Sequence, residues 1–274
     1  MKVLIAVDME GISGVVNWDQ VSPSHPEYVR FRRLMTAEVN AAIRGALAGG
    51  ADEVVVCDGH GDSTNLLLEE LDGRARLNCG KMPPCRMVEG VDQGVEAAMF
   101  MGYHARAGAP NAILGHTWSA SRVASVWLNG SLIGEIGINA ALCGHYGVPV
   151  VMISGDQSAC AEAVELLGPL EVAIVKQARG NMAAECLPPG VAQETIAAAA
   201  EAALRRLRAG QGPRPWSPQR PIHLAIDFLH LEMAARAAAV PGVRWDESRR
   251  IEFSAEDMPA AFRTFWAAVT ISRP

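Results

Sequence analysis

Residues 2–11 read KVLIAVDMEG, an unbroken apolar run followed at once by two acidic residues and a glycine. The apolar part, residues 3–7, contains β-branched side chains and is typical of a strand buried on both faces inside a parallel sheet. Side chains alternate along a strand, so Asp8 and Glu10 should point to the same side. Two neighbouring carboxylates at the end of a buried strand repel each other unless a proton or a metal ion lies between them.

Two further apolar runs also end in polar residues. Residues 53–58 predict a second buried strand, which leads to His60, and residues 97–103 predict another, which leads to His104. In layered α/β sheets, ligands gather at the carboxyl ends of the strands. We therefore expect one edge of the sheet to collect Asp8, Glu10, His60 and His104.

Apolar spacing and turn residues predict the remaining elements. The expected helices span residues 29–47, 137–146, 156–167, 191–208, 231–239 and 258–269, and further strands span 123–128, 148–154, 172–176, 222–229 and 249–253. Three further segments give weaker signals. Ser63 or Thr64 could cap a short helix that runs towards Leu71. Residues 72–88, which contain Pro83-Pro84, are expected to be irregular, and residues 91–100 to be partly helical.

The alternation of strands and helices predicts an α/β fold, a layered α/β/α sheet domain over residues 1–210 with its metal site at the strand ends. Prolines recur between residues 210 and 221 and predict a stiff linker. Residues 221–274 are expected to form a smaller C-terminal α+β annex.

Composition excludes several classes of function. The chain of 274 residues has a net charge of −6 and no long basic run, which argues against a nucleic-acid or anionic-membrane partner. No apolar run is long enough for a transmembrane helix or a signal-peptide core. The six cysteines form no Cys-x-x-Cys pair and are expected to be reduced thiols of a cytoplasmic protein.

The polar residues at the strand ends form a donor set suited to zinc or another first-row divalent metal. Glu135 supplies a third carboxylate, and Asp8 is a candidate to bridge two metals because Glu10 lies beside it. Two metals ~3.5–4 Å apart can share a water, lower its pKa and polarise a carbonyl or phosphoryl group. His116 lies in a glycine-flanked loop and is not needed for coordination, so it is a candidate general base or oxyanion stabiliser.

Each residue also has a simpler interpretation. An acidic residue at the end of a strand is commonly a turn residue, and an isolated histidine commonly has a structural role. Glu135 could be a helix N-terminal acid, and His116 a loop residue bonded to the backbone. Asp58 and Asp62 are either groups that orient His60 or turn residues.

Five motifs between residues 6 and 141 sharpen the interpretation. They are D8-M-E-G11, D58-G-H60, G102-Y-H-A105, G115-H-T117, and N129-G130 followed by G134-E-x-G137-x-N139-A140. In this order they resemble the D-aminopeptidase family of the dipeptide-transport type (peptidase family M55).

The resemblance implies two Zn²⁺ per subunit, although other divalent metals would also suit the donors. Asp8 would bridge them, Glu10 and His60 would complete one site, His104 and Glu135 the other, and His116 would be the catalytic histidine. One position departs from the family pattern: Ala6 stands where the family has serine. Relatives are decamers of two stacked pentamers, so the resemblance also implies a homo-oligomer.

The resulting hypothesis is a cytoplasmic dinuclear zinc aminopeptidase, a metallopeptidase that hydrolyses the N-terminal residue of short peptides of D- or L-amino acids. Two alternatives stay open. A dinuclear metal phosphoesterase would use the same metals, but the G-N-H-[DE] motif of common metallophosphatases is absent. A non-catalytic metal- or peptide-binding oligomer would need no role for His116.

Overall fold

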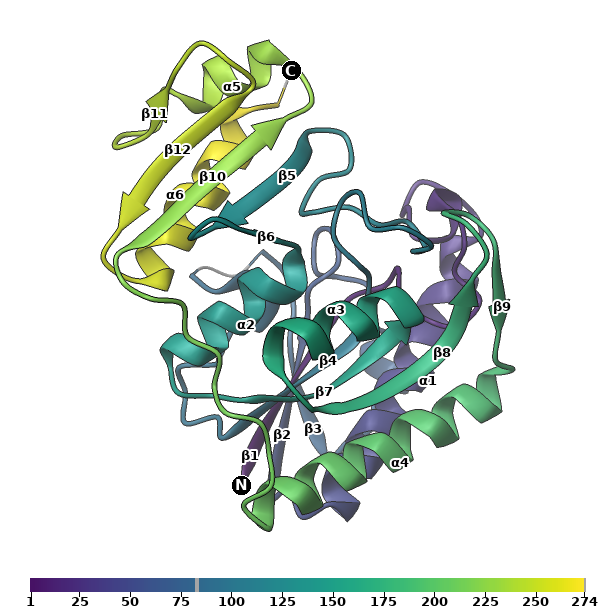
Figure 1. The fold of residues 1–274 in the computed structure, drawn as a ribbon. Coiled ribbons are helices and arrows are strands. Elements are labelled where there is room, and N and C mark those ends of the chain that lie inside the picture. Colours follow the sequence, from purple (N-terminus) through teal and green to yellow (C-terminus); the bar gives the residue numbers. More distant parts are fainter. Residues whose placement is uncertain (82–83, 274) are drawn as a thin grey trace.

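Strand β1 (Lys2–Val7) lies inside the larger of two sheets in the computed structural model, which describes residues 1–81 and 84–273. This sheet has seven strands in the order β3-β2-β1-β4-β7-β8-β9. Neighbouring strands are parallel except for β8 and β9, which are antiparallel. The buried central strand expected from residues 3–7 is confirmed (Figure 1).

The remaining elements follow in chain order. The strands are β2 (Glu53–Asp58), β3 (Ala75–Asn78), β4 (Ala97–Tyr103), β5 (Val123–Leu128), β6 (Ser131–Ile133), β7 (Val150–Asp156), β8 (Glu171–Ala178), β9 (Ala184–Cys186), β10 (Ile222–Phe228), β11 (Arg244–Trp245) and β12 (Arg250–Ala255). The α-helices are α1 (Tyr28–Ala48), α2 (Glu135–His145), α3 (Gln157–Leu167), α4 (Pro189–Arg208), α5 (Leu231–Ala237) and α6 (Met258–Ile271), and short 3₁₀ helices are η1 (Trp18–Gln20), η2 (Leu68–Glu70) and η3 (Arg86–Val88).

Helices cover both faces of the seven-stranded sheet, which gives the expected α/β/α layers. Val3 and Ile5 of β1 pack in one apolar cluster with residues of α1 and α4. Leu4 and Ala6 pack in a second cluster with residues of α2 and α3. The alternation of β1 therefore divides its side chains between two cores, and the two helix pairs lie on opposite sides of the sheet (Figure 1).

The direction of chain progression reverses next to β1. Strands β2 and β3 lie on one side of it, whereas β4, β7 and β8 follow on the other side. In open α/β sheets, a crevice for ligands forms outside the carboxyl ends of the strands at such a reversal. The carboxyl ends of β1, β2 and β4 therefore mark the place where a site is expected.

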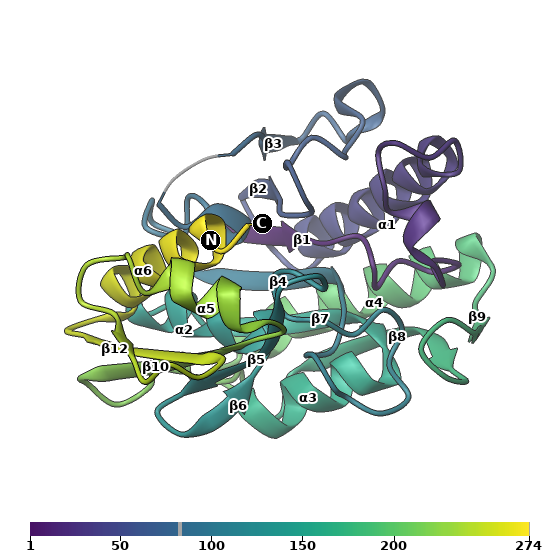
Figure 2. The same ribbon diagram turned by 90° about the horizontal axis from the view of Figure 1, so that it is seen from above.

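The second sheet has five strands in the order β11-β12-β10-β5-β6, with antiparallel pairing throughout. It lies with α5 and α6 at one end of the molecule, whereas α1 and β9 lie at the other (Figure 2). Strands β5 and β6 precede the proline-containing segment 210–221, so residues 221–274 do not build their sheet alone. The hairpin β5–β6 leads directly into α2 and thereby joins the two sheets.

Three local expectations are wrong. Residues 63–67 form no helix, and only the short helix η2 follows them. The N–H groups of Asn65 and Leu66 donate to the Asp58 carboxylate (2.6 and 2.8 Å) instead of starting a helix. Within the segment expected to be irregular, β3 extends the sheet edge by pairing with β2; its residues 82 and 83, including Pro83, lie outside the described part.

The third is the partly helical stretch: residues 91–94 are turns, and β4 begins at Ala97. The other predicted helices and strands occur within a few residues of their expected bounds. Within the described ranges, none of the helices combines the length and apolar character needed to cross a membrane.

Candidate metal centre

Three adjacent strands deliver polar side chains to the expected crevice. Asp8 and His104 directly follow β1 and β4, and His60 lies two residues beyond β2. Backbone bonds continue past the strand ends: the Asp8 N–H donates to the Met101 carbonyl (2.7 Å), and the Gly59 N–H donates to that of Val7 (2.8 Å). The segments that carry these side chains are thus fixed to neighbouring strands.

The Asp8 carboxylate lies between two imidazoles. Its Oδ1 is 3.2 Å from Nδ1 of His60, and its Oδ2 is 3.4 Å from Nε2 of His104. Asp8 and His104 are only 2% and 1% exposed, so water contributes little to their solvation. Each oxygen of the carboxylate therefore faces a different histidine.

A further carboxylate stands beside each histidine. Glu10 Oε2 is 3.1 Å from His60 Nδ1, and Glu135 Oε1 is 3.3 Å from His104 Nε2. Glu135 is the first residue of α2, reached through the β5–β6 hairpin, and it is buried. These residues form two trios of possible ligands, and Asp8 belongs to both. In each trio the ligand atoms lie within 4.8 Å of one another: Asp8, Glu10 and His60 in one, and Asp8, His104 and Glu135 in the other. The structure thus brings together all five residues expected to bind metal.

Hydrogen bonds present a free nitrogen of each histidine to the carboxylates. His60 Nε2 lies 2.9 Å from the Val21 carbonyl, and His104 Nδ1 lies 3.0 Å from that of Ala105. A carbonyl only accepts, so each bond places the ring proton there and leaves a lone pair on the opposite nitrogen. Among the described residues, His104 Nε2 and Glu10 Oε2 have no hydrogen-bond partner. Such buried acceptor atoms without a donor, one an oxygen and one a nitrogen, fit a divalent metal.

The buried carboxylates of this site also favour a positive charge close to them. Burial favours the neutral form of His60 and His104, but the facing carboxylates outweigh it and raise the pKa of each imidazole well above its usual range. Burial likewise opposes ionisation of Asp8, yet the facing imidazoles of His104 and His60 hold its pKa well below the usual value. In the absence of a metal, protons on the imidazoles would balance part of the negative charge.

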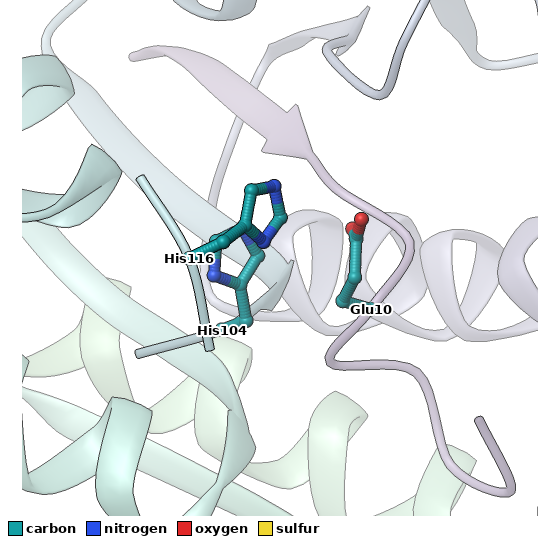
Figure 3. Close-up of side chains that lie close together, drawn as sticks. All are labelled: Glu10, His104 and His116. Atoms are coloured by element: carbon teal, nitrogen blue, oxygen red, sulfur yellow. The ribbon is translucent and has the colours of Figure 1, made fainter. Parts of the chain in front are cut away.

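His116 lies beside this set, in the loop between β4 and β5. Its ring stacks on that of His104, with centroids 4.0 Å apart and planes 13° from parallel, and Glu10 approaches from the segment after β1 (Figure 3). Its Nε2 is 3.7 Å from Glu135 Oε1, and its Nδ1 is 2.9 Å from the Leu114 carbonyl. Glu10, His104 and His116 also form a trio of possible ligands within 4.8 Å, so the exclusion of His116 from coordination stays a prediction.

A cavity of about 260 Å³ opens above these residues. Asp8, His60 and Glu135 line its floor, and Trp18, Arg86 and Trp118 also line it. Trp118 has a positive φ of 64°, and its N–H donates to Glu135 Oε1 (2.7 Å). A larger cavity, about 580 Å³, lies along β10 and β12 and contains none of the five predicted ligands.

Asp58 and Asp62 have different surroundings. Asp58 accepts the Asn65 side-chain amide at 2.7 Å, and the same amide donates to the His60 carbonyl at 2.7 Å. Asp58 thus supports the backbone of His60 rather than its ring. Asp62 is exposed and pairs with Lys81 at 2.8 Å.

A buried lysine that the sequence did not single out holds the segment after β1. Lys176 of β8 donates from Nζ to the carbonyls of Glu10 (2.5 Å), Ile12 (3.0 Å) and Val15 (2.7 Å). Burial lowers the pKa of this ammonium to about 8. Lys176 stands inside an apolar strand pattern. Nothing in that pattern indicates that three carbonyl acceptors from another part of the chain surround its side chain.

Comparisons with known proteins show the family and the fold of the chain. The family model described as D-aminopeptidase matches residues 1–267. A D-aminopeptidase of Bacillus subtilis (strain 168) is 36% identical over 264 residues, which cover 96% of this chain and 94% of that protein. The solved structure of the Zn-dependent D-aminopeptidase DppA from Bacillus subtilis, described as a self-compartmentalizing protease, superposes with a TM-score of 0.94 at 34% identity, covering 99% of this chain and 98% of the other.

Proposed function

The chain belongs to the D-aminopeptidase family, and from that premise we propose that it is a zinc-dependent aminopeptidase with two metal ions per subunit. It removes the N-terminal residue of short peptides. The observation that carries this proposal is the Asp8 carboxylate, whose two oxygens face His60 and His104 separately. A carboxylate shared between two ligand trios is suited to a pair of metals rather than to a single ion.

The ligand assignment follows the two trios. Asp8, Glu10 and His60 would hold one zinc, and Asp8, His104 and Glu135 the other. When bound, the metals supply a water of lowered pKa and polarise the scissile carbonyl. The protein orients its ligands through the carbonyls of Val21 and Ala105, which fix the histidine tautomers.

His116 is the proposed proton carrier. The bond between its Nδ1 and the Leu114 carbonyl leaves Nε2 as the basic nitrogen on the side of Glu135. Nε2 can accept a proton from the attacking water, and once protonated it can donate to the oxyanion or to the departing amine. The stacked ring of His104 holds the imidazole in place.

Two further properties are part of the proposal. The related enzyme described as self-compartmentalizing supports a homo-oligomer, and we propose a decamer. The absence of a Cys-x-x-Cys pair and the free state of the six cysteines support a cytoplasmic location.

The test is a matched screen of D- and L-aminoacyl amides and dipeptides, with metal content measured on the same samples. Hydrolysis of peptides with a free N-terminus, lost on chelation and restored by zinc, is the expected result. N-acetylated versions of the same peptides are the control and should not be cleaved. Tight zinc binding with no hydrolysis of any peptide would favour the non-catalytic alternative, and cleavage of phosphate esters alone would favour the phosphoesterase.

A further inference from the structure

Arg86 lines the same cavity as the metal ligands, although no motif includes it. It is the one lysine or arginine among the described residues that line this cavity, whose floor otherwise carries the carboxylates of Asp8, Glu10 and Glu135. A guanidinium stays charged at any physiological pH. The cavity thus combines an anionic, metal-binding floor with a fixed positive charge.

The Arg86 side chain lacks a counter-ion in the described part of the chain. Its Nη1 is buried and has no hydrogen-bond partner there, and no ion pair includes it. Asp62, the acid whose charge acts on it, is paired with Lys81. One face of the guanidinium lies over the Trp266 ring, 5.2 Å from the centroid. A stacked guanidinium with unused donors is a typical receptor for a carboxylate.

The backbone at Arg86 is held in an unfavourable conformation. Its φ is 52°, in the left-handed region that non-glycine residues rarely adopt. Its carbonyl accepts the thiol of Cys57, at the end of β2, at 3.1 Å. Residues held in such conformations concentrate at ligand sites, where the surrounding structure fixes them. Trp118, which lines the same cavity, also has a positive φ.

We propose that Arg86 binds the C-terminal carboxylate of a dipeptide whose N-terminal residue lies over the Asp8–Glu135 centre. This proposal rests on the aminopeptidase function above and specifies its substrate class. The cavity volume of about 260 Å³ is below the usual range of ligand pockets, ~300–1,000 Å³, which suits a substrate of two residues. A free carboxylate is the group that distinguishes a dipeptide from an aminoacyl amide or a longer chain at this position.

The experiment compares a dipeptide with the C-terminal amide of the same dipeptide. In the wild-type protein, kcat/KM should favour the free acid by about ten- to a hundredfold, the contribution expected of a charge-assisted hydrogen bond. Arg86→Gln should abolish this preference by raising the KM of the free acid. The kcat/KM of the amide should stay within about twofold of the wild-type value, and the zinc content should be unchanged. Arg86→Lys keeps the charge but loses the two-pronged geometry, and should retain only part of the preference.

Arg76→Gln is the matched control because it removes a positive charge from an exposed side chain of β3, and its acid-to-amide ratio should equal that of the wild type. An unchanged ratio in either Arg86 variant overturns the proposal. An equal loss on both substrates overturns it as well, since it would assign Arg86 a structural role. If the wild-type protein cleaves neither substrate, the aminopeptidase function itself fails, which separates the two outcomes.

Discussion

At the scale of single residues, Asp8 has the most consequential position, because it contributes to both ligand trios. Protein purified without chelator should contain close to two equivalents of zinc per chain. Asp8→Ala should lose most of both, since the two oxygens of this one carboxylate lie 3.2 Å from His60 and 3.4 Å from His104. Elemental analysis measures the content, and Asp19→Ala, at an exposed acid, is the control. Full metal retention by Asp8→Ala would contradict the bridging role.

A substitution at His116 distinguishes a role in proton transfer from a role in metal coordination. If it carries a proton, His116→Ala should keep near-normal zinc and fold but lose at least ~100-fold in kcat, the size of effect typical of general acid–base groups and oxyanion donors. Steady-state kinetics and elemental analysis on the same preparation test this. His25→Ala is the control, because His25 is partly exposed and does not line the cavity. Unchanged activity would remove His116 from the mechanism, and loss of zinc would make it a ligand.

At the scale of elements, the segments after β1 and β4 approach each other so closely that glycine is required. A Cβ on Gly102 would lie 2.3 Å from the Asp8 carbonyl, and its φ is +67°. Gly102→Ala should therefore destabilise the protein by more than ~2 kcal/mol, and if Asp8 is a ligand it should also lower the zinc content, because Asp8 would be displaced. Gly94→Ala is the control: its φ is +74°, but open space surrounds it. Chemical denaturation should find Gly94→Ala clearly the milder of the two, and equal losses would refute the argument from close approach.

Helix α1 carries a buried acid that makes stability depend on pH. Burial raises the pKa of Glu38 from 4.5 to about 7, although the Ser13 N–H donates to its carboxylate (2.9 Å). A raised folded-state pKa contributes stability that is fully present below pH 4.5 and is lost as pH rises towards 7. The loss amounts to roughly 3 kcal/mol for a shift of this size.

Glu38→Gln should remove this dependence, because a glutamine Oε1 can still accept from Ser13. Relative to the wild type, the variant should gain stability progressively between pH 4.5 and 7 and differ little at pH 4.5. Urea denaturation across this range measures the difference, and Glu27→Gln, at the exposed position that precedes the same helix, should show none of it. A pH-independent difference between Glu38→Gln and wild type would exclude the ionised, buried carboxylate.

At the scale of the whole molecule, assembly is the property to be tested. Agreement with the solved relative, which is described as a self-compartmentalizing protease, extends over nearly all of both chains. We expect light scattering to report a mass ten times that of the 29.2 kDa chain, unchanged on dilution through the micromolar range. A stable monomer under these conditions would contradict the decamer, and a smaller closed ring would correct the subunit number.

The spacing of apolar residues in the sequence was sufficient to predict most of the helices and strands. Residues 3–7 and 97–103 are apolar without interruption, and only strands inside a parallel sheet bury both faces in this way. Two of the three wrong expectations concern segments whose backbone bonds go to partners outside the segment. The N–H groups of Asn65 and Leu66 donate to the Asp58 side chain, and β3 forms because β2 offers it an edge. Neither contact can be recognised from the pattern of the segment itself, because each partner lies outside it.

Four of the five predicted ligands could be brought to one place from the sequence by itself, since Asp8, Glu10, His60 and His104 stand at or just after strand ends, and parallel strands align those ends. Glu135 and His116 were also candidates in the sequence, but no strand end places them beside the others, because the first depends on a hairpin of the second sheet and the second on a loop. Only the tertiary structure placed β5 and β6 in the C-terminal sheet and brought Lys176 and Arg86 to the site. Long-range contacts of this kind leave no periodic signal, because they depend on how distant segments pack rather than on the spacing of neighbouring residues.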